Sequence, residues 1–159
     1  MASYQTSSSE ETKQLGKELA ELLLREKPDD MEREGAFVVA LSGDLGAGKT
    51  TFTQGFFEGL GVKERATSPT FIIMRRHALP TPPKKKNIFS TVFHVDAYRL
   101  KDPSELITLG FAELLADPKN IFLIEWPEQV GDLVPDDAVL LNFSYGEKEN
   151  ERTITIAEK

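Results

Sequence analysis

Residues Phe37 to Phe52 read FVVALSGDLGAGKTTF, and this stretch decides the fold. It opens with a short, continuous apolar run, Phe37 to Leu41, which is typical of a buried parallel strand. A glycine-rich loop follows, and the apolar residues after the loop recur at helical spacing as far as Leu60. Gly61 then stands where a helix commonly ends. The stretch therefore predicts a strand, a glycine loop and a helix in immediate succession.

The loop matches the phosphate-binding pattern G-x-x-x-x-G-K-[ST]. A polyphosphate must approach the backbone closely, and Gly43, Gly46 and Gly48 remove the side chains that would prevent this. The loop N–H groups then point inward, next to the positive N-terminal end of the helix. We expect Lys49 to reach the β- and γ-phosphates and the Thr50 hydroxyl to ligand Mg²⁺. The alternative is a glycine-rich turn with an incidental lysine.

Two further apolar runs each end in a carboxylate: VFHV ends in Asp96 and IFLI ends in Glu125. Ligands of open α/β sheets bind at the carboxyl ends of the strands, so both acids are candidates for the same site. Either acid could hold Mg²⁺, hold its water or orient an attacking water; the alternative is a turn or cap residue. His94 could bond to the site or be a structural histidine. Trp126 could pack in the core or stack near a nucleotide.

The rest of the chain alternates between strand and helix patterns, without an internal repeat or a domain linker. We expect residues 1–7 to be frayed and a helix to begin near Ser8, which forms a capping box with Glu11. Residues 77–87 should form an exposed connection, with the basic run Lys84 to Lys86 as a solvated tip or as a contact to an acidic partner or a nucleic acid. Further expected elements are strands at Phe71 to Met74, Ile88 to Val95, Ile121 to Ile124, Val139 to Phe143 and Thr153 to Ile156, and a helix that opens at Asp102.

This alternation predicts an α/β fold with an at least partly parallel sheet, as one domain over residues 1–159. The net charge is −7, which disfavours autonomous binding to a nucleic-acid backbone. There are no cysteines, so disulfides, thiolate metal sites and a cysteine nucleophile are excluded. No apolar run reaches the roughly 20 residues of a membrane helix, and the N-terminus lacks a signal-peptide pattern. We expect a soluble, cytoplasmic protein with no membrane contact.

Four sequence blocks, in this order, carry a closer resemblance: GDLGAGKTTF, SPTF, HVDAYRL and LIEWPE. The chain resembles the TsaE family of small bacterial P-loop ATPases, which are required for threonylcarbamoyladenosine modification of tRNA. The resemblance implies a P-loop NTPase-like three-layer sandwich with a mostly parallel central sheet. It implies ATP and Mg²⁺ as cofactors and slow hydrolysis by the protein alone. The implied partners are the TsaD and TsaB proteins. The tRNA, which is modified at position 37, would be a partner only indirectly, through the complex with those two proteins.

The resemblance also implies roles for individual residues. Lys49, Asp96 and Glu125 would be catalytic, Thr50 and Glu125 would hold the metal, and Thr67 to Thr70 would form a segment similar to switch I. The implied nucleotide-binding residues are Ser9, Thr12, Gly43, Leu45, Gly46, Ala47, Gly48, Lys49, Thr50, Thr51, Asp96, Trp126 and Arg152.

Two other functions remain open for the same phosphate loop. One is a small-molecule kinase, although the chain has no evident lid region rich in arginine. The other is a nucleotide switch without useful hydrolysis. An arginine finger is not identified by the sequence: Arg75, Arg76 and Arg99 are candidates, and a partner could supply one.

Overall fold

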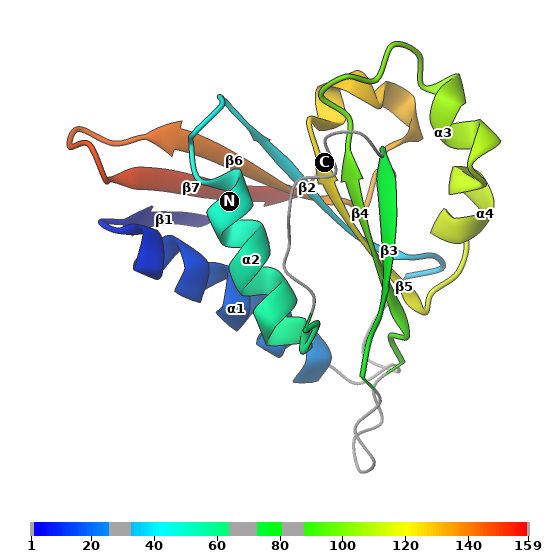
Figure 1. Ribbon diagram of the computed structural model, residues 1–159, viewed down its shortest axis with the longest axis horizontal. Helices are drawn as coiled ribbons and strands as arrows, with labels where there is room; N and C mark the ends of the chain where they lie inside the picture. The colour runs from blue at the N-terminus through cyan, green and yellow to red at the C-terminus, as the bar shows by residue number, and fades with distance from the viewer. Residues whose placement is uncertain (1, 26–32, 64–72, 81–87, 159) are drawn as a thin grey trace.

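The computed structural model describes residues 2–25, 33–63, 73–80 and 88–158. It contains a seven-stranded sheet with the order β1-β7-β6-β2-β5-β4-β3 (Figure 1). The strands are β1 (Ala2–Thr6), β2 (Phe37–Gly43), β3 (Met74–Ala78), β4 (Thr91–Asp96), β5 (Asn120–Glu125), β6 (Val139–Tyr145) and β7 (Arg152–Glu158). The helices are α1 (Ser9–Arg25), α2 (Lys49–Leu60), α3 (Ser104–Thr108) and α4 (Phe111–Leu115), with single 3-10 turns η2 (Pro127–Gln129) and η3 (Gly131–Leu133).

The centre of the sheet is parallel and its edges are antiparallel. Strand β2 pairs in parallel with both β5 and β6, and β4 pairs in parallel with β5. The outer pairings, β3 with β4, β7 with β6 and β1 with β7, are antiparallel. In this register Glu125 lies opposite Leu41 of β2 on one side and opposite Asp96 of β4 on the other. Three strands therefore end almost level, at the edge where the glycine loop begins.

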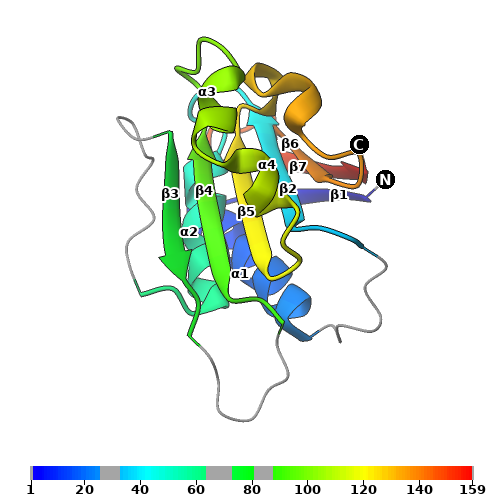
Figure 2. The same ribbon diagram turned by 90° about the vertical axis from the view of Figure 1, so that its right-hand side faces the viewer.

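Helices cover both faces of this sheet. Figures 1 and 2 show α1 and α2 on one face and α3 and α4 on the other. Alternate residues along a strand point to opposite faces, and the buried residues of β2 and β5 follow this rule. Val39 and Leu123 belong to the core under α1 and α2, whereas Val38 and Phe122 belong to the core under α3 and α4. The expected three-layer sandwich with a mostly parallel centre is thus confirmed.

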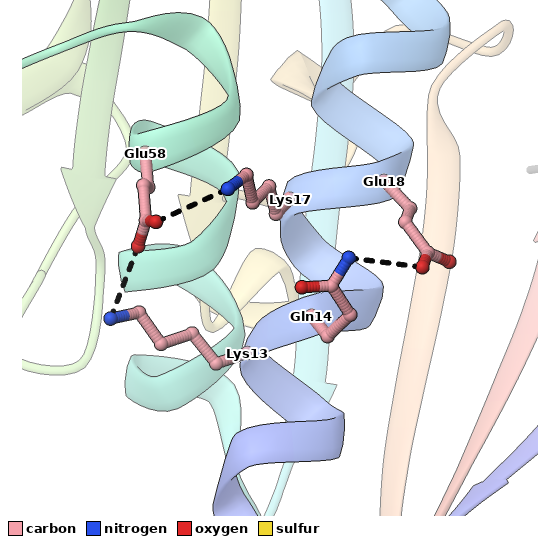
Figure 3. A network of polar contacts seen from close by, with 5 residues as sticks. All are labelled: Lys13, Gln14, Lys17, Glu18 and Glu58. Carbon is pink, nitrogen blue, oxygen red and sulfur yellow. Dashed lines mark hydrogen bonds and ion pairs between the residues drawn. The ribbon is translucent and has the colours of Figure 1, made fainter.

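Helices α1 and α2 approach each other closely because glycines face the contact. A Cβ atom on Gly55 of α2 would overlap the carbonyl oxygen of Lys13, and one on Gly16 of α1 would overlap the carbonyl oxygen of Phe52. Ion pairs cross the same interface: Figure 3 shows Lys13 and Lys17 of α1 reaching Glu58 of α2. This packing holds the start of α1 beside the glycine loop.

Two expectations about the chain's less regular parts are wrong. Residues 2–6 are not frayed, because their backbone pairs with β7, which would otherwise be the edge of the sheet. Thr6 at the end of β1 is buried, and its Oγ1 lies 2.7 Å from Oγ1 of Thr12. The exposed connection also begins too early in the prediction: His77 and Ala78 belong to β3, and Leu79 is buried.

Strand boundaries on this side of the sheet differ from those expected. Strand β3 begins at Met74, the last residue of the expected strand Phe71 to Met74, and its extent follows its antiparallel pairing with β4. Strand β4 begins at Thr91, three residues after the expected Ile88. Residues 71 and 72 and the basic run Lys84 to Lys86 lie outside the described residues.

The packing of α1 on α2 leads to a stability prediction. Gly55→Ala should lower the free energy of unfolding by about 1–3 kcal/mol, because the added methyl group has no space against the backbone of α1. Glu58→Gln weakens the two ion pairs at the same interface, but these are solvent-exposed and should matter much less. Urea unfolding of both variants measures the difference. If Glu58→Gln lowered the free energy of unfolding as much as Gly55→Ala does, steric fit would not be what controls this interface.

Candidate functional site

The glycine loop runs from the end of β2 to the start of α2, as predicted. Gly43, Gly46 and Gly48 have φ angles of 140°, 78° and 105°. These are positive values that residues with side chains rarely adopt. A Cβ on Gly43 would also collide with the carbonyl oxygen of Phe143 on the neighbouring strand β6. Gly48 is the N-cap of α2 and adds no side chain, so the positive end of the helix stays accessible.

A hollow of about 100 Å³ opens between this loop, the start of α1 and the β6–β7 hairpin. Its lining residues are Ser8, Ser9, Thr12, Gly46, Gly48, Thr51, Asn150 and Arg152. Six of these eight are residues that the sequence resemblance named, and they come from three separate parts of the chain. Ser8 and Asn150 were missed, since nothing in their local pattern distinguishes them from ordinary cap and turn residues.

The β6–β7 hairpin holds the glycine loop from outside. The Tyr145 hydroxyl donates to the carbonyl oxygen of Leu45, and Nη2 of Arg152 donates to that of Gly46 at 3.3 Å. The Arg152 guanidinium lies 4.7 Å from the centre of the Tyr145 ring, which faces it across the hairpin. Arg152 is thus brought to the loop, and Tyr145 is an additional contact that the sequence analysis did not find.

The two strand-end acids meet as the parallel register requires. Asp96 is partly exposed and accepts a 3.0 Å hydrogen bond from the N–H of Tyr98. Glu125 is buried, and its Oε2 lies 2.9 Å from Nε2 of His94. Of the two interpretations left open for His94, the structure favours a bond to the site, because its partner is the predicted acid.

Lys49 joins the loop to these acids. Its Nζ donates to the carbonyl oxygen of Gly43 and lies 3.6 Å from the centre of the Trp126 ring. Burial lowers the pKa of the Lys49 ammonium below its ordinary value of 10.5, while nearby carboxylates oppose this shift. In decreasing order of effect, these carboxylates are Glu125, Glu128, Asp96 and Asp44. Lys49, Asp96 and Glu125 therefore share one electrostatic environment.

Trp126 fills the first of the two roles that the sequence left open, packing in the core, whereas stacking near a nucleotide stays a prediction. It packs against the core under α3 and α4 and against Tyr98, with ring centres 4.9 Å apart. Its other contact is the Lys49 ammonium, a cation–π interaction. Its φ of 59° is the one positive value among the described non-glycine residues.

Glu128, in the turn that follows Trp126, is a further residue near the loop that the sequence analysis missed. Its carboxylate accepts a hydrogen bond from the hydroxyl of Ser42, just before the loop.

The remaining predicted positions are distributed along the loop and α2. Leu45 is 63% exposed and Ala47 is fully buried, whereas Thr50 is exposed in the first turn of α2. Arg75 and Arg76 lie on β3 beside β4, and Arg99 is exposed after β4. The segment Thr67 to Thr70 lies outside the described residues.

The oxygen donors at this edge fit Mg²⁺ bound together with phosphates. Within the described ranges, no group of three or more histidine and acidic side chains could hold a metal ion alone. Thr50, Asp96 and Glu125 nevertheless supply hydroxyl and carboxylate oxygens around the glycine loop. Mg²⁺ typically takes one or two such ligands and completes its shell with water and substrate phosphates.

Comparison with known proteins decides the family. The family model "Threonylcarbamoyl adenosine biosynthesis protein TsaE" matches residues 6–154. The chain belongs to the TsaE family. Its relatives include proteins named tRNA threonylcarbamoyladenosine biosynthesis protein TsaE from Haemophilus influenzae and Bacillus subtilis. The first is 35% identical over 82% of this chain and 73% of its own length. The second is 35% identical over 96% of this chain and 84% of its own length.

A solved structure agrees with this family membership. The crystal structure of Bacillus subtilis YdiB superposes with a TM-score of 0.67 at 28% sequence identity. The match covers 99% of this chain and 84% of that chain. The fold described above is therefore shared along almost the entire sequence.

The lowered pKa of Lys49 leads to a prediction about pH. In the alkaline range below 10.5, the folded protein binds fewer protons at this site than the unfolded chain does. The free energy of unfolding should therefore rise with pH through that range, relative to a Lys49→Met variant that cannot titrate there. Urea unfolding of both proteins at a series of pH values measures the difference. If the free energy of unfolding of the wild-type protein, relative to that of Lys49→Met, stayed constant or fell as the pH rises, burial of the ammonium would not control its pKa.

Proposed function

We propose that this protein is a Mg²⁺-dependent ATP-binding and ATP-hydrolysing accessory protein of tRNA N6-threonylcarbamoyladenosine biosynthesis. It acts in the cytoplasm together with TsaD and TsaB, and it meets tRNA through their complex. The observation that carries the proposal is the convergence of Lys49, the glycine loop and the carboxylates of Asp96 and Glu125 at one sheet edge. The names of the family model and of the relatives support the pathway.

In the proposed reaction, the loop binds the triphosphate and a water attacks the γ-phosphorus in line with the β–γ bridging oxygen. The bond from the γ-phosphorus to that oxygen breaks, ADP leaves, and the proton lost by the water passes to the released phosphate or to solvent. The loop N–H groups and the N-terminal end of α2 surround the phosphate oxygens. Lys49 leaves its contact with the Gly43 carbonyl and places its ammonium on the β- and γ-phosphates. Thr50 would ligand Mg²⁺, and Glu125 would do so directly or through water. When bound by these residues, Mg²⁺ would contribute neutralisation of phosphate charge.

The acids differ in the task for which each is suited. Asp96 is partly exposed and close to Lys49, which suits it to orient the attacking water. Glu125 is buried and held by His94, which suits it to a fixed role toward the metal. Positioning and charge neutralisation then account for the catalysis. Turnover by the protein alone is slow, and the partner complex raises it by completing the site.

The rest of the nucleotide lies toward the hollow beside the loop. Ser9, Thr12 and Arg152 line this hollow and offer hydroxyl and guanidinium groups to the ribose and base. The choice of ATP over GTP follows the family, and the sequence contains no guanine-binding N-K-x-D stretch. The net charge of −7 is consistent with reaching tRNA through partner proteins. None of the helices in the described segments is long and apolar enough to cross a membrane.

Removing the lysine should abolish ATP turnover while leaving the fold intact. We expect Lys49→Ala to lower phosphate release by about 10²–10³-fold, with TsaD, TsaB and tRNA present or absent, because a phosphate-neutralising charge is lost. Lys119→Ala is the matched control, since this exposed lysine precedes β5 at the opposite end of the sheet. Circular dichroism monitors the fold. Unchanged turnover in Lys49→Ala would remove the glycine loop from the mechanism.

The same assay separates the two other functions. ADP that forms only when a metabolite is added, without free phosphate, would indicate a kinase. Binding of ATP without turnover under any condition would indicate a switch.

Glu125→Ala should reduce hydrolysis more than ATP binding, and the opposite pattern would contradict its role toward the metal.

A further inference from the structure

A buried hydrogen bond behind the site links His94 of β4 to Glu125 of β5. Nε2 of His94 lies 2.9 Å from Oε2 of Glu125, and the two side chains are only 2% and 6% exposed. A carboxylate so far from water is costly unless it receives hydrogen bonds or an opposite charge. Lys49 supplies charge from the loop side, and His94 supplies the hydrogen bond from the interior.

The proton arrangement on His94 follows from its second nitrogen. Nδ1 is buried and has no hydrogen-bond partner among the described residues. A proton on Nδ1 would be a buried donor without an acceptor, whereas a lone pair there is less costly. The geometry therefore assigns the proton to Nε2, which donates it to the carboxylate.

Aromatic packing holds the imidazole in place from the other side. The ring of Phe57, in α2, meets the His94 ring edge-on, with centres 5.5 Å apart. The same phenyl ring meets the His77 ring at 5.1 Å, and Phe57 is almost completely buried. His94 thus cannot turn away from Glu125 without disturbing the core beneath α2.

We propose that His94 is a positioning residue that binds Oε2 of Glu125, so that the other carboxylate oxygen, Oε1, is directed to Mg²⁺ or to a water of its shell. This inference rests on the proposed function, because it concerns the same metal–nucleotide site. Groups that orient metal ligands from behind typically contribute 10–100-fold in metal affinity or activity. A histidine that only fills the core would contribute to stability and not to the Mg²⁺ requirement.

Three variants separate positioning from packing. His94→Gln keeps an N–H donor close to the place of Nε2, whereas His94→Phe keeps the ring and loses the donor. His77→Gln is the matched control, since it changes the other buried histidine that packs on Phe57. Each variant is tested for thermal stability, for nucleotide binding in EDTA with a fluorescent ATP analogue, and for the Mg²⁺ concentration that gives half-maximal ATP turnover.

We expect His94→Phe to raise the half-maximal Mg²⁺ concentration by about 10-fold or more, with nucleotide affinity in EDTA changed by less than about 2-fold. His94→Gln should restore most of the wild-type Mg²⁺ dependence. His77→Gln should change only stability. If His94→Phe and His94→Gln shift the Mg²⁺ dependence equally, or if neither shifts it, His94 does not position Glu125.

A spectroscopic measurement tests the hydrogen bond without any turnover. The chain has two histidines, so its imidazole ¹⁵N spectrum contains two sets of signals, which His77→Gln assigns. The expected result for His94 is a proton on Nε2 and a bare Nδ1. The opposite tautomer would overturn the inference while leaving the proposed function standing. A wild-type protein that neither binds nor hydrolyses Mg·ATP would instead overturn the proposed function, and the inference with it.

Discussion

The parallel pairing of β5 with both β2 and β4 is the constraint on which the site depends. It sets Glu125 and Asp96, the last residues of β5 and β4, side by side and level with Leu41, two residues before the end of β2. The chain leaves β2 as the glycine loop, so the loop begins beside both carboxylates. A slip of one residue in either pairing would turn an acid to the opposite face of the sheet. Continuous burial of β5 on both faces makes such a slip costly.

Around this edge, charge and packing depend on each other. Lys49 is buried, so its ammonium loses hydration, and the surrounding acids and the Trp126 ring compensate for the loss. Glu125 is buried to the same extent, and its carboxylate interacts with both Lys49 and His94. The glycine contacts between α1 and α2 then place Ser9 and Thr12 beside the loop. The site is thereby built from parts of the chain that lie far apart in the sequence and are held together by the sheet and by the packing of α1 on α2.

Local patterns were sufficient to predict the central part of this arrangement. The run Phe37 to Leu41 and the loop after it have a local signature, and the acids Asp96 and Glu125 follow apolar runs that are buried on both faces of the sheet. The rule that ligands bind at strand ends was enough to bring these acids to the loop. The family resemblance added Ser9, Thr12 and Arg152, which share no local pattern with the loop.

What the sequence could not predict depends on contacts between distant segments. The strand Ala2–Thr6 is largely exposed and carries no apolar alternation, so only its pairing with β7 reveals it. The extent of β3 is set by its partner β4, and the charged residues Arg75 and Arg76 follow directly on the apolar run that predicted a strand ending at Met74. Tyr145 contacts Leu45 only because the hairpin folds over the loop. A tertiary contact of this kind leaves no signature in the sequence around either residue.

A crystal structure with a non-hydrolysable ATP analogue and Mn²⁺, which anomalous scattering can locate, would test whether this sheet edge binds a metal and a nucleotide together. We expect the triphosphate to lie within the glycine loop, with the Lys49 ammonium on its β- and γ-phosphates. The metal should lie between those phosphates and the Thr50 hydroxyl, with Glu125 bound to it directly or through one water. A triphosphate bound elsewhere, or a metal remote from both Thr50 and Glu125, would show that the glycine loop and the strand-end acids do not form one nucleotide site.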